Sequence, residues 1–174
     1  MHKHMHGCEM RLEYPLGESE YCDIVCITRG TKIGVELKYK TEKHKYVAKD
    51  GEVFNLKNHG AQDCGRYDFL KDISRLERWI QTGHIKHGYA VFLTNDHLYW
   101  EQSKDNSTVD EQFRIHDGEN MEGRLCWDKN ASSGTMKNRE LPIVLHDTYT
   151  MKWEDLPHEN ADYPFRYLCI PISA

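Results

Sequence analysis

Apolar and polar residues alternate in several short stretches of the chain, which is the pattern of β-strands with one buried face. Two such stretches, residues 21–27 and 33–39, flank Arg29-Gly30 and predict a β-hairpin with a two- or four-residue connection. A further strand is expected at residues 10–16, just before them. The first part of the chain therefore predicts three consecutive strands.

One long helix is predicted over residues 66–82, and Gly83 is a typical C-terminal stop. Its apolar stripe consists of Phe69, Leu70, Ile73, Leu76 and Ile80. A basic stripe on the opposite side consists of Lys71, Arg75 and Arg78. We expect the basic stripe to face solvent, because acidic residues at helical spacing can pair with it. These acidic residues are Asp68, Asp72 and Glu77.

The region after the helix predicts more strands. Residues 87–94 read as a buried strand that follows a crossover helix, so they should lie parallel to one neighbour in a mixed sheet. Further candidate strands are residues 112–116, 123–127, 141–149 and 165–172. Pro171 suggests that the last of them ends at a sheet edge. The pattern as a whole predicts an α/β domain with extra C-terminal strands.

Composition narrows the class of protein only slightly. The chain has 174 residues, a formal net charge of -5 and a mean hydropathy of -0.79, which suits one domain. We expect residues 1–9 to be flexible, 10–95 to form the core and 96–174 a strand-rich extension. The strongly basic composition typical of nucleic-acid binders is absent, so such binding would need a local basic patch. Without a long apolar run or a signal-peptide core, a cytoplasmic protein with no membrane partner is expected.

The candidate chemistry lies in the predicted hairpin, where Asp23, Glu36 and Lys38 interrupt apolar strands. Because strand side chains alternate between faces, the hairpin places Asp23 opposite or diagonal to Glu36, with Lys38 one step along. The apolar residues of the other face, from Ile33 to Tyr39, are expected to pack into the core. Two carboxylates suit a hard divalent cation, and a nearby ammonium suits an attacking water or a phosphate.

A simpler interpretation is that these three charges form cross-strand ion pairs on a solvated sheet face, worth up to about 1 kcal/mol. Val25 and Ile27 share the face of Asp23, so that face is not uniformly polar. A partly desolvated carboxylate pair favours a functional site.

An Asp on one strand followed by Glu-x-Lys on the next resembles the PD-(D/E)xK, or restriction-endonuclease-like, nuclease superfamily. The resemblance covers residues 10–95 and implies a mixed β-sheet core in β-β-β-α-β order. It implies Asp23 and Glu36 as ligands of Mg²⁺ or Mn²⁺, with the carbonyl of Leu37 as a further ligand. It also implies that Lys38 lies next to the attacking water or the phosphate.

The same resemblance concerns two other parts of the chain. The first turn of the helix after Glu-x-Lys often carries polar residues near the site, which implies Gln62 and Arg66 as contacts to phosphate or metal-bound water. The family usually has a helix before its first strand, and only about ten residues precede Arg11 here. Either the chain is a fragment, or we expect another element, a second copy in a homodimer or a partner chain to cover that side of the sheet. Glu13 is a possible accessory acid.

Residues 41–61 predict a basic arm beside this site. The turn signal Lys49-Asp50-Gly51 lies between two short apolar stretches and predicts a β-hairpin. Lys40, Lys43 and Lys45 could hold a phosphate backbone, preferably that of DNA. A hairpin that lysines merely keep soluble explains them equally well.

Two functions from different classes remain open. The first is a metal-dependent nuclease that hydrolyses nucleic-acid phosphodiester bonds. The alternative is a noncatalytic nuclease-like module that binds nucleic acid or a protein partner. The sequence alone does not distinguish DNA from RNA or single from double strands.

Overall fold

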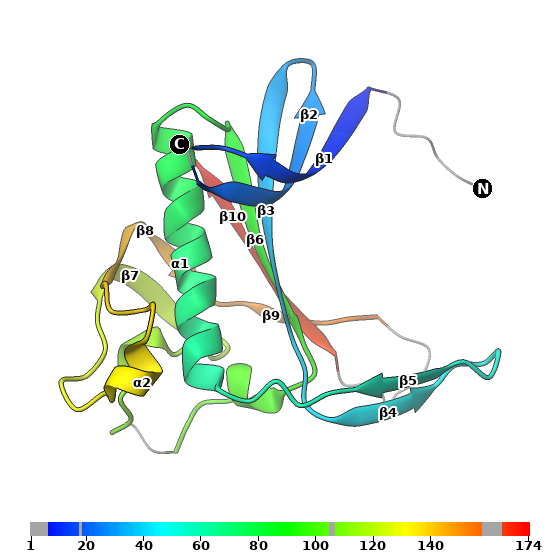
Figure 1. Ribbon diagram of the computed structural model, residues 1–174, viewed down its shortest axis with the longest axis vertical. Coiled ribbons are helices and arrows are strands. Elements are labelled where there is room, and N and C mark those ends of the chain that lie inside the picture. The colour runs from blue at the N-terminus through cyan, green and yellow to red at the C-terminus, as the bar shows by residue number, and fades with distance from the viewer. Residues whose placement is uncertain (1–6, 18, 105–106, 158–164) are drawn as a thin grey trace.

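A six-stranded mixed sheet with one long helix against it forms the centre of the protein (Figure 1). The computed structural model describes residues 7–17, 19–104, 107–157 and 165–174. The strand order is β1-β2-β3-β6-β10-β9. These strands are β1 Cys8–Pro15, β2 Tyr21–Thr28, β3 Thr31–Lys40, β6 His87–Thr94, β9 Trp153–Asp155 and β10 Arg166–Ser173, and the helix is α1 Gln62–Gln81. The predicted α/β class is confirmed.

The remaining elements surround this centre. β4 His44–Val47 and β5 Val53–Leu56 form a hairpin that projects from the sheet as an arm. β7 Asn120–Leu125 and β8 Ile143–Thr150 form a second small sheet that packs on α1. The short helix α2 is Ser133–Met136, and 3₁₀ turns occupy His97–Tyr99 and Glu111–Phe113.

The predicted hairpin is present as β2 and β3. Thr28 pairs with Thr31, so the connection is the two-residue turn Arg29-Gly30. Both turn residues have positive φ, 48° and 77°, as the type I′ turn preferred by twisted hairpins requires. β3 then runs parallel to β6, with Gly34 beside Gly88, which confirms the predicted parallel strand after the helix.

Two glycines bring α1 close to the sheet. A Cβ on Gly34 would lie 2.8 Å from Cδ1 of Ile85, and one on Gly88 would lie 3.1 Å from Cδ2 of Leu76. A side chain at either position would require Ile85 or Leu76 to shift, so the two glycines allow α1 to pack closely on β3 and β6. This close packing places Asp72 and Arg75, which precede Leu76 on α1, against the side chains of β3.

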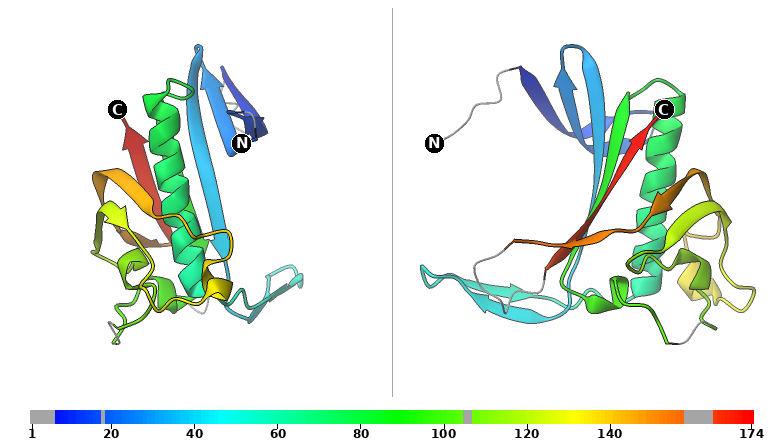
Figure 2. Two further views of the ribbon diagram at one scale, coloured as in Figure 1. Left: turned by 60° about the vertical axis from the view of Figure 1, so that its left-hand side comes forward. Right: turned by 180° about the vertical axis from the view of Figure 1, so that it is seen from behind.

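The face of the sheet that α1 covers is the charged one, contrary to the prediction. Among the described residues no helix covers the opposite face (Figure 2), where Leu37, Tyr39 and Tyr89 remain 46%, 49% and 39% exposed. The expectation that the face from Ile33 to Tyr39 packs into the core was therefore wrong. The reason is that Gly34 shares the face of Glu36, and its lack of a side chain makes that face the one on which a helix fits.

The C-terminal strands were predicted in part. Residues 112–116 were expected to be a strand, but Glu111–Phe113 form a 3₁₀ turn. There Phe113 is fully buried and packs edge-on against Tyr67 and Trp127, with ring centroids 5.3 Å and 4.8 Å away. β10 lies inside the sheet, yet β9 pairs only with Arg166–Leu168, so Pro171 does lie on an open edge.

Glu77 of α1 fastens the small β7–β8 sheet to the helix. Between the pairs Met121–Tyr149 and Gly123–Leu145, β8 has three residues where β7 has one. The backbone N–H groups of His146 and Asp147 in this irregular stretch donate to Glu77 Oε1 at 2.9 and 3.1 Å. The Tyr149 hydroxyl also donates to it, at 2.9 Å. One buried carboxylate therefore accepts bonds that a regular ladder would have formed.

Candidate functional site

The structure brings the three charged residues of the hairpin together on the helix-covered face. Glu36 and Lys38 share the face of Gly34 on β3. The β2–β3 ladder ends at the pair Ile24–Val35, and Asp23 is the next residue. Its Oδ2 accepts the Leu37 N–H at 2.7 Å, in place of a backbone partner. The Asp23 carboxylate is thus held beside Glu36 where the two strands separate.

Glu36 is the most buried of these groups. It is 2% exposed, and its Oε2 accepts a bond from Arg75 Nη2 at 2.6 Å. Its Oε1 is buried and has no partner among the described residues. Burial raises the pKa of Glu36 to about 8, with the charges of Asp72 and Asp23 acting in the same direction and Arg75 opposing it.

Asp72 and Arg75 of α1 complete the cluster, and the sequence did not identify either as part of a site. Lys38 Nζ lies 2.9 Å from Asp72 Oδ2, and Arg75 Nη2 lies 3.1 Å from Asp72 Oδ1. Burial raises the pKa of Asp72, although Lys38 and Arg75 favour its ionised form. The prediction that Arg75 faces solvent was wrong, because the close approach of α1 to β3 places its guanidinium against Glu36.

A signal for Asp72 was present in the sequence. Asp72 follows Phe69 by three residues and precedes Leu76 by four, so it lies within the apolar stripe of the helix. An acidic residue inside a stripe that packs on a sheet needs a buried partner. Lys38 is that partner.

We call Asp23, Glu36, Lys38, Asp72 and Arg75 the charged cluster. Its three carboxylates supply the oxygen donors that Mg²⁺ and Mn²⁺ prefer. The buried Glu36 Oε1, which no described group satisfies, fits a metal ligand, since such orphan atoms are costly unless something binds them. As they stand, ligand atoms of Asp23, Glu36 and Asp72 do not all lie within 4.8 Å of one another, so a shared cation would have to draw them closer together.

An open groove of about 860 Å³ reaches the cluster. It lies between the end of the β1–β2 connection, α1 and β8, and it is lined by Ser19, Glu20, Tyr21, Lys71, Ser74, Arg75, Arg78, Gln81, Val144 and His146. Arg75 belongs both to this lining and to the charged cluster. Tyr21 lies two residues before Asp23 on β2. We call this the α1–β8 groove.

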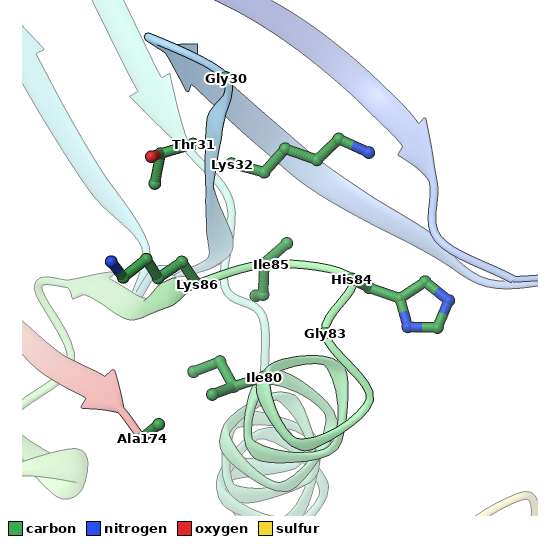
Figure 3. A pocket seen from close by; sticks show the side chains of 9 residues that line it. All are labelled: Gly30, Thr31, Lys32, Ile80, Gly83, His84, Ile85, Lys86 and Ala174. Carbon is green, nitrogen blue, oxygen red and sulfur yellow. The ribbon is translucent and has the colours of Figure 1, made fainter.

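A second hollow, of about 460 Å³, lies at the end of α1 near the β2–β3 turn (Figure 3). Figure 3 shows Ile80 and Ile85 at its centre, with Lys32, Lys86 and His84 around them. None of the predicted metal ligands lines it. None of them lines the α1–β8 groove either, but that groove contains Arg75, which donates to Glu36.

Gln62 and Arg66 lie in a different network. Gln62 Nε2 donates to Asp96 Oδ2 at 2.8 Å. Arg66 is 4% exposed, and its guanidinium donates to Asp110 at 2.7 Å and to the Leu98 carbonyl at 2.5 Å. The implied contact of Arg66 with phosphate is not possible in this arrangement, because buried partners take its guanidinium.

The other predicted residues lie apart from the charged cluster. Glu13 is exposed on β1 with φ 47°, and no contact described for it involves the cluster. Lys40 ends β3, Lys45 lies in β4, and Lys43 lies between the two strands. The predicted arm is confirmed as the β4–β5 hairpin, which points away from α1 in Figure 1.

A small group at the base of this arm brings Glu42, Asp96 and His97 together, with one potential ligand atom from each within 4.8 Å of the others. Asp96 already accepts bonds from Gln62 and from the Leu98 N–H. This group carries no predicted residue, but among the described residues its ligand atoms are the ones that already lie close enough to share a metal ion. The charged cluster differs from it in being more buried and in having an unsatisfied carboxylate oxygen.

Comparison with known proteins adds no relative: no family model, curated protein or solved structure matches the chain. Within the described ranges, no helix is both long enough and apolar enough to cross a membrane.

The raised pKa of Glu36 has a measurable effect on stability. Between about pH 4.5 and 8 the native protein keeps a proton that the unfolded chain has released, so rising pH should lower the free energy of unfolding in this window. One such proton contributes a slope of about 1.4 kcal/mol per pH unit. Urea unfolding of wild type and Glu36→Gln over this window, in EDTA, should show a shallower decline in the variant. Equal slopes would contradict the assignment.

Proposed function

We propose that the protein is a metal-dependent nuclease that hydrolyses phosphodiester bonds of nucleic acids with Mg²⁺ or Mn²⁺. The observation that carries the proposal is the charged cluster, in which Asp23, Glu36 and Lys38 lie on one face of the hairpin and Arg75 links Glu36 to an open groove. Glu36 Oε1 is buried without a partner among the described residues, which leaves one oxygen of this side chain available to a ligand.

The arrangement of elements also supports the proposal. Once the β4–β5 arm is set aside, β1, β2, β3, α1 and β6 follow in the β-β-β-α-β order that the resemblance implies. Asp23 lies at the end of the β2–β3 ladder, and the Glu-x-Lys residues lie on the adjacent strand. The pattern that suggested the superfamily thus corresponds to neighbouring side chains.

Each residue has a role that follows from its contacts. Asp23, Glu36 and Asp72 would hold the ion, which when bound polarises a phosphate and lowers the pKa of a water. Lys38 is held by Asp72 at 2.9 Å, so its ammonium is oriented to stabilise negative charge that develops on the phosphate. The cover of α1 keeps water away from Glu36 and strengthens these interactions.

A specific observation also favours the alternative, a noncatalytic module that binds nucleic acid or a protein partner. Arg75 already lies between Glu36 and Asp72 and donates to both, so a guanidinium occupies the place that a cation would take. Calorimetric titration with Mn²⁺ distinguishes the two functions. Binding that Glu36→Gln abolishes supports the nuclease, whereas salt-dependent DNA binding without Mn²⁺ affinity supports the module.

The direct test is cleavage. The protein should be incubated with single- and double-stranded DNA and with RNA, in Mg²⁺, in Mn²⁺ and in EDTA. We expect cleavage of at least one substrate that needs the ion and is strongly reduced in Asp23→Asn. Cleavage that persists unchanged in Asp23→Asn, or in EDTA, would contradict the proposal.

A further inference from the structure

The α1–β8 groove is a local basic surface on an acidic protein. Its lining includes Lys71, Arg75, Arg78 and His146. Glu20 is the one acidic side chain among the described lining residues, and it already accepts bonds from Arg78 at 2.7 Å and from the Trp79 indole at 3.3 Å. The whole chain carries a formal net charge of -5, so the charge of this surface is opposite in sign to that of the protein. Clustered basic side chains along a groove are what a phosphate backbone requires.

Arg75 connects this groove to the charged cluster. Its Nη2 makes both bonds to Glu36 and Asp72, at 2.6 and 3.1 Å. Its Nε is buried and has no partner among the described residues. The side chain as a whole is 25% exposed, and its guanidinium lies 5.1 Å from the centroid of the Trp79 ring. Arg75 is therefore accessible from the groove, and its hydrogen-bonding capacity is not fully used by the two carboxylates.

A divalent cation and Arg75 compete for the same carboxylates. A metal ion bound by Glu36 and Asp72 would repel a guanidinium that lies between them. The groove offers Arg75 a second position, because a planar guanidinium binds a phosphate through paired hydrogen bonds.

We propose that the α1–β8 groove binds the phosphodiester backbone of a nucleic acid, and that Arg75 leaves Glu36 and Asp72 for a backbone phosphate when the metal binds. This inference rests on the proposed function and identifies where the substrate lies. By linkage, nucleic acid in the groove raises the metal affinity, and metal in the cluster raises the affinity for nucleic acid by the same factor. The β4–β5 arm, the surface expected from the sequence, points away from α1, whereas the groove reaches the cluster.

The groove is tested by charge reversal. Binding of a fluorescent single-stranded oligonucleotide should be measured by anisotropy in EDTA over a series of salt concentrations. Lys71→Glu should weaken binding about tenfold at low salt and reduce the dependence on salt, because a phosphate contact is lost. Lys129→Glu makes the same charge change on an exposed residue between β7 and α2, and should change binding less than about twofold. If Lys71→Glu and Lys129→Glu weakened oligonucleotide binding equally, the groove would not be the binding surface. Binding that is lost only in Lys43→Glu, next to the arm, would also contradict the proposal.

The exchange of Arg75 is tested by Mn²⁺ calorimetry, which needs no cleavage. Arg75→Gln should bind Mn²⁺ at least about tenfold more tightly than wild type without nucleic acid, because no guanidinium competes for Glu36. A phosphorothioate oligonucleotide that resists cleavage should raise the Mn²⁺ affinity of wild type and have little effect on Arg75→Gln. Arg75→Lys serves as a second variant that keeps the charge, and it should retain part of the competition.

The outcomes separate this inference from the proposed function. Cleavage with no coupling between Mn²⁺ and the oligonucleotide would overturn the exchange of Arg75 and leave the nuclease intact. Loss of oligonucleotide binding in Lys71→Glu, together with coupled Mn²⁺ binding but no cleavage of any substrate, would support the groove and contradict the nuclease.

Discussion

Replacing Lys38 with alanine should lower the rate of metal-dependent cleavage by about a thousandfold. Removing one charged group that stabilises a developing negative charge typically lowers the rate of an enzyme about 10²–10³-fold. If the same group also helps to transfer a proton, its removal lowers the rate further. Lys38 is held by Asp72 at 2.9 Å and lies in the charged cluster with Asp23 and Glu36. Its loss leaves Arg75 as the only cation described against Asp72. Initial rates at saturating Mn²⁺ measure the effect, and calorimetry on the same variant should show that Mn²⁺ still binds.

Lys40→Ala is the matched control for this variant. Lys40 lies two residues further along β3 on the same face, but no contact described for it involves the charged cluster. We expect Lys40→Ala to change cleavage by a few-fold at most, mainly through substrate affinity. If Lys38→Ala cleaved at the wild-type rate, or if both variants lost activity equally, the role of Lys38 would be refuted.

Replacing Glu77 with alanine should lower the free energy of unfolding by about 3–5 kcal/mol. The carboxylate is 4% exposed and accepts bonds from two backbone N–H groups of β8 and from the Tyr149 hydroxyl. Without it these donors stay buried and unsatisfied, at a cost of about 1–3 kcal/mol each if no water replaces the carboxylate. Urea denaturation of both proteins gives the difference directly.

Two further variants test whether the bonds cause this loss. Glu101→Ala removes an exposed carboxylate and should change stability by less than about 0.5 kcal/mol. Tyr149→Phe removes one of the three donors and should cost about 1 kcal/mol. A Glu77→Ala protein as stable as Glu101→Ala would mean that β8 does not depend on this carboxylate.

The parts of the fold that follow from local signals could be predicted from the sequence. Arg29-Gly30 specifies the turn between β2 and β3, and the alternation of side chains then places Asp23 near Glu36 and Lys38. The apolar stripe and Gly83 located the helix and its end, although the helix begins at Gln62, four residues before the prediction. A helix before residues 87–94 then predicted a strand parallel to one neighbour, and in the structure that neighbour is β3.

The rest depended on how elements pack, which no short segment determines. Arg75 looked solvent-facing because its helical neighbours include acidic residues, yet the space at Gly34 and Gly88 brings α1 close enough for it to reach Glu36. The same two glycines decide which face of the sheet is covered. Likewise, the burial of Phe113 among aromatic rings favours a 3₁₀ turn over the expected strand.

The bond from the Leu37 amide to Asp23 makes one backbone proton a natural probe of the charged cluster. An ion that binds the Asp23 carboxylate changes the electron density at Oδ2, the oxygen that accepts the hydrogen bond from the Leu37 amide. The amide resonance of Leu37 in a nuclear magnetic resonance spectrum should then move when a diamagnetic ion such as Mg²⁺ binds, and its exchange with solvent should change as well. The occupancy of the site could thus be followed in the intact protein without any label on a ligand.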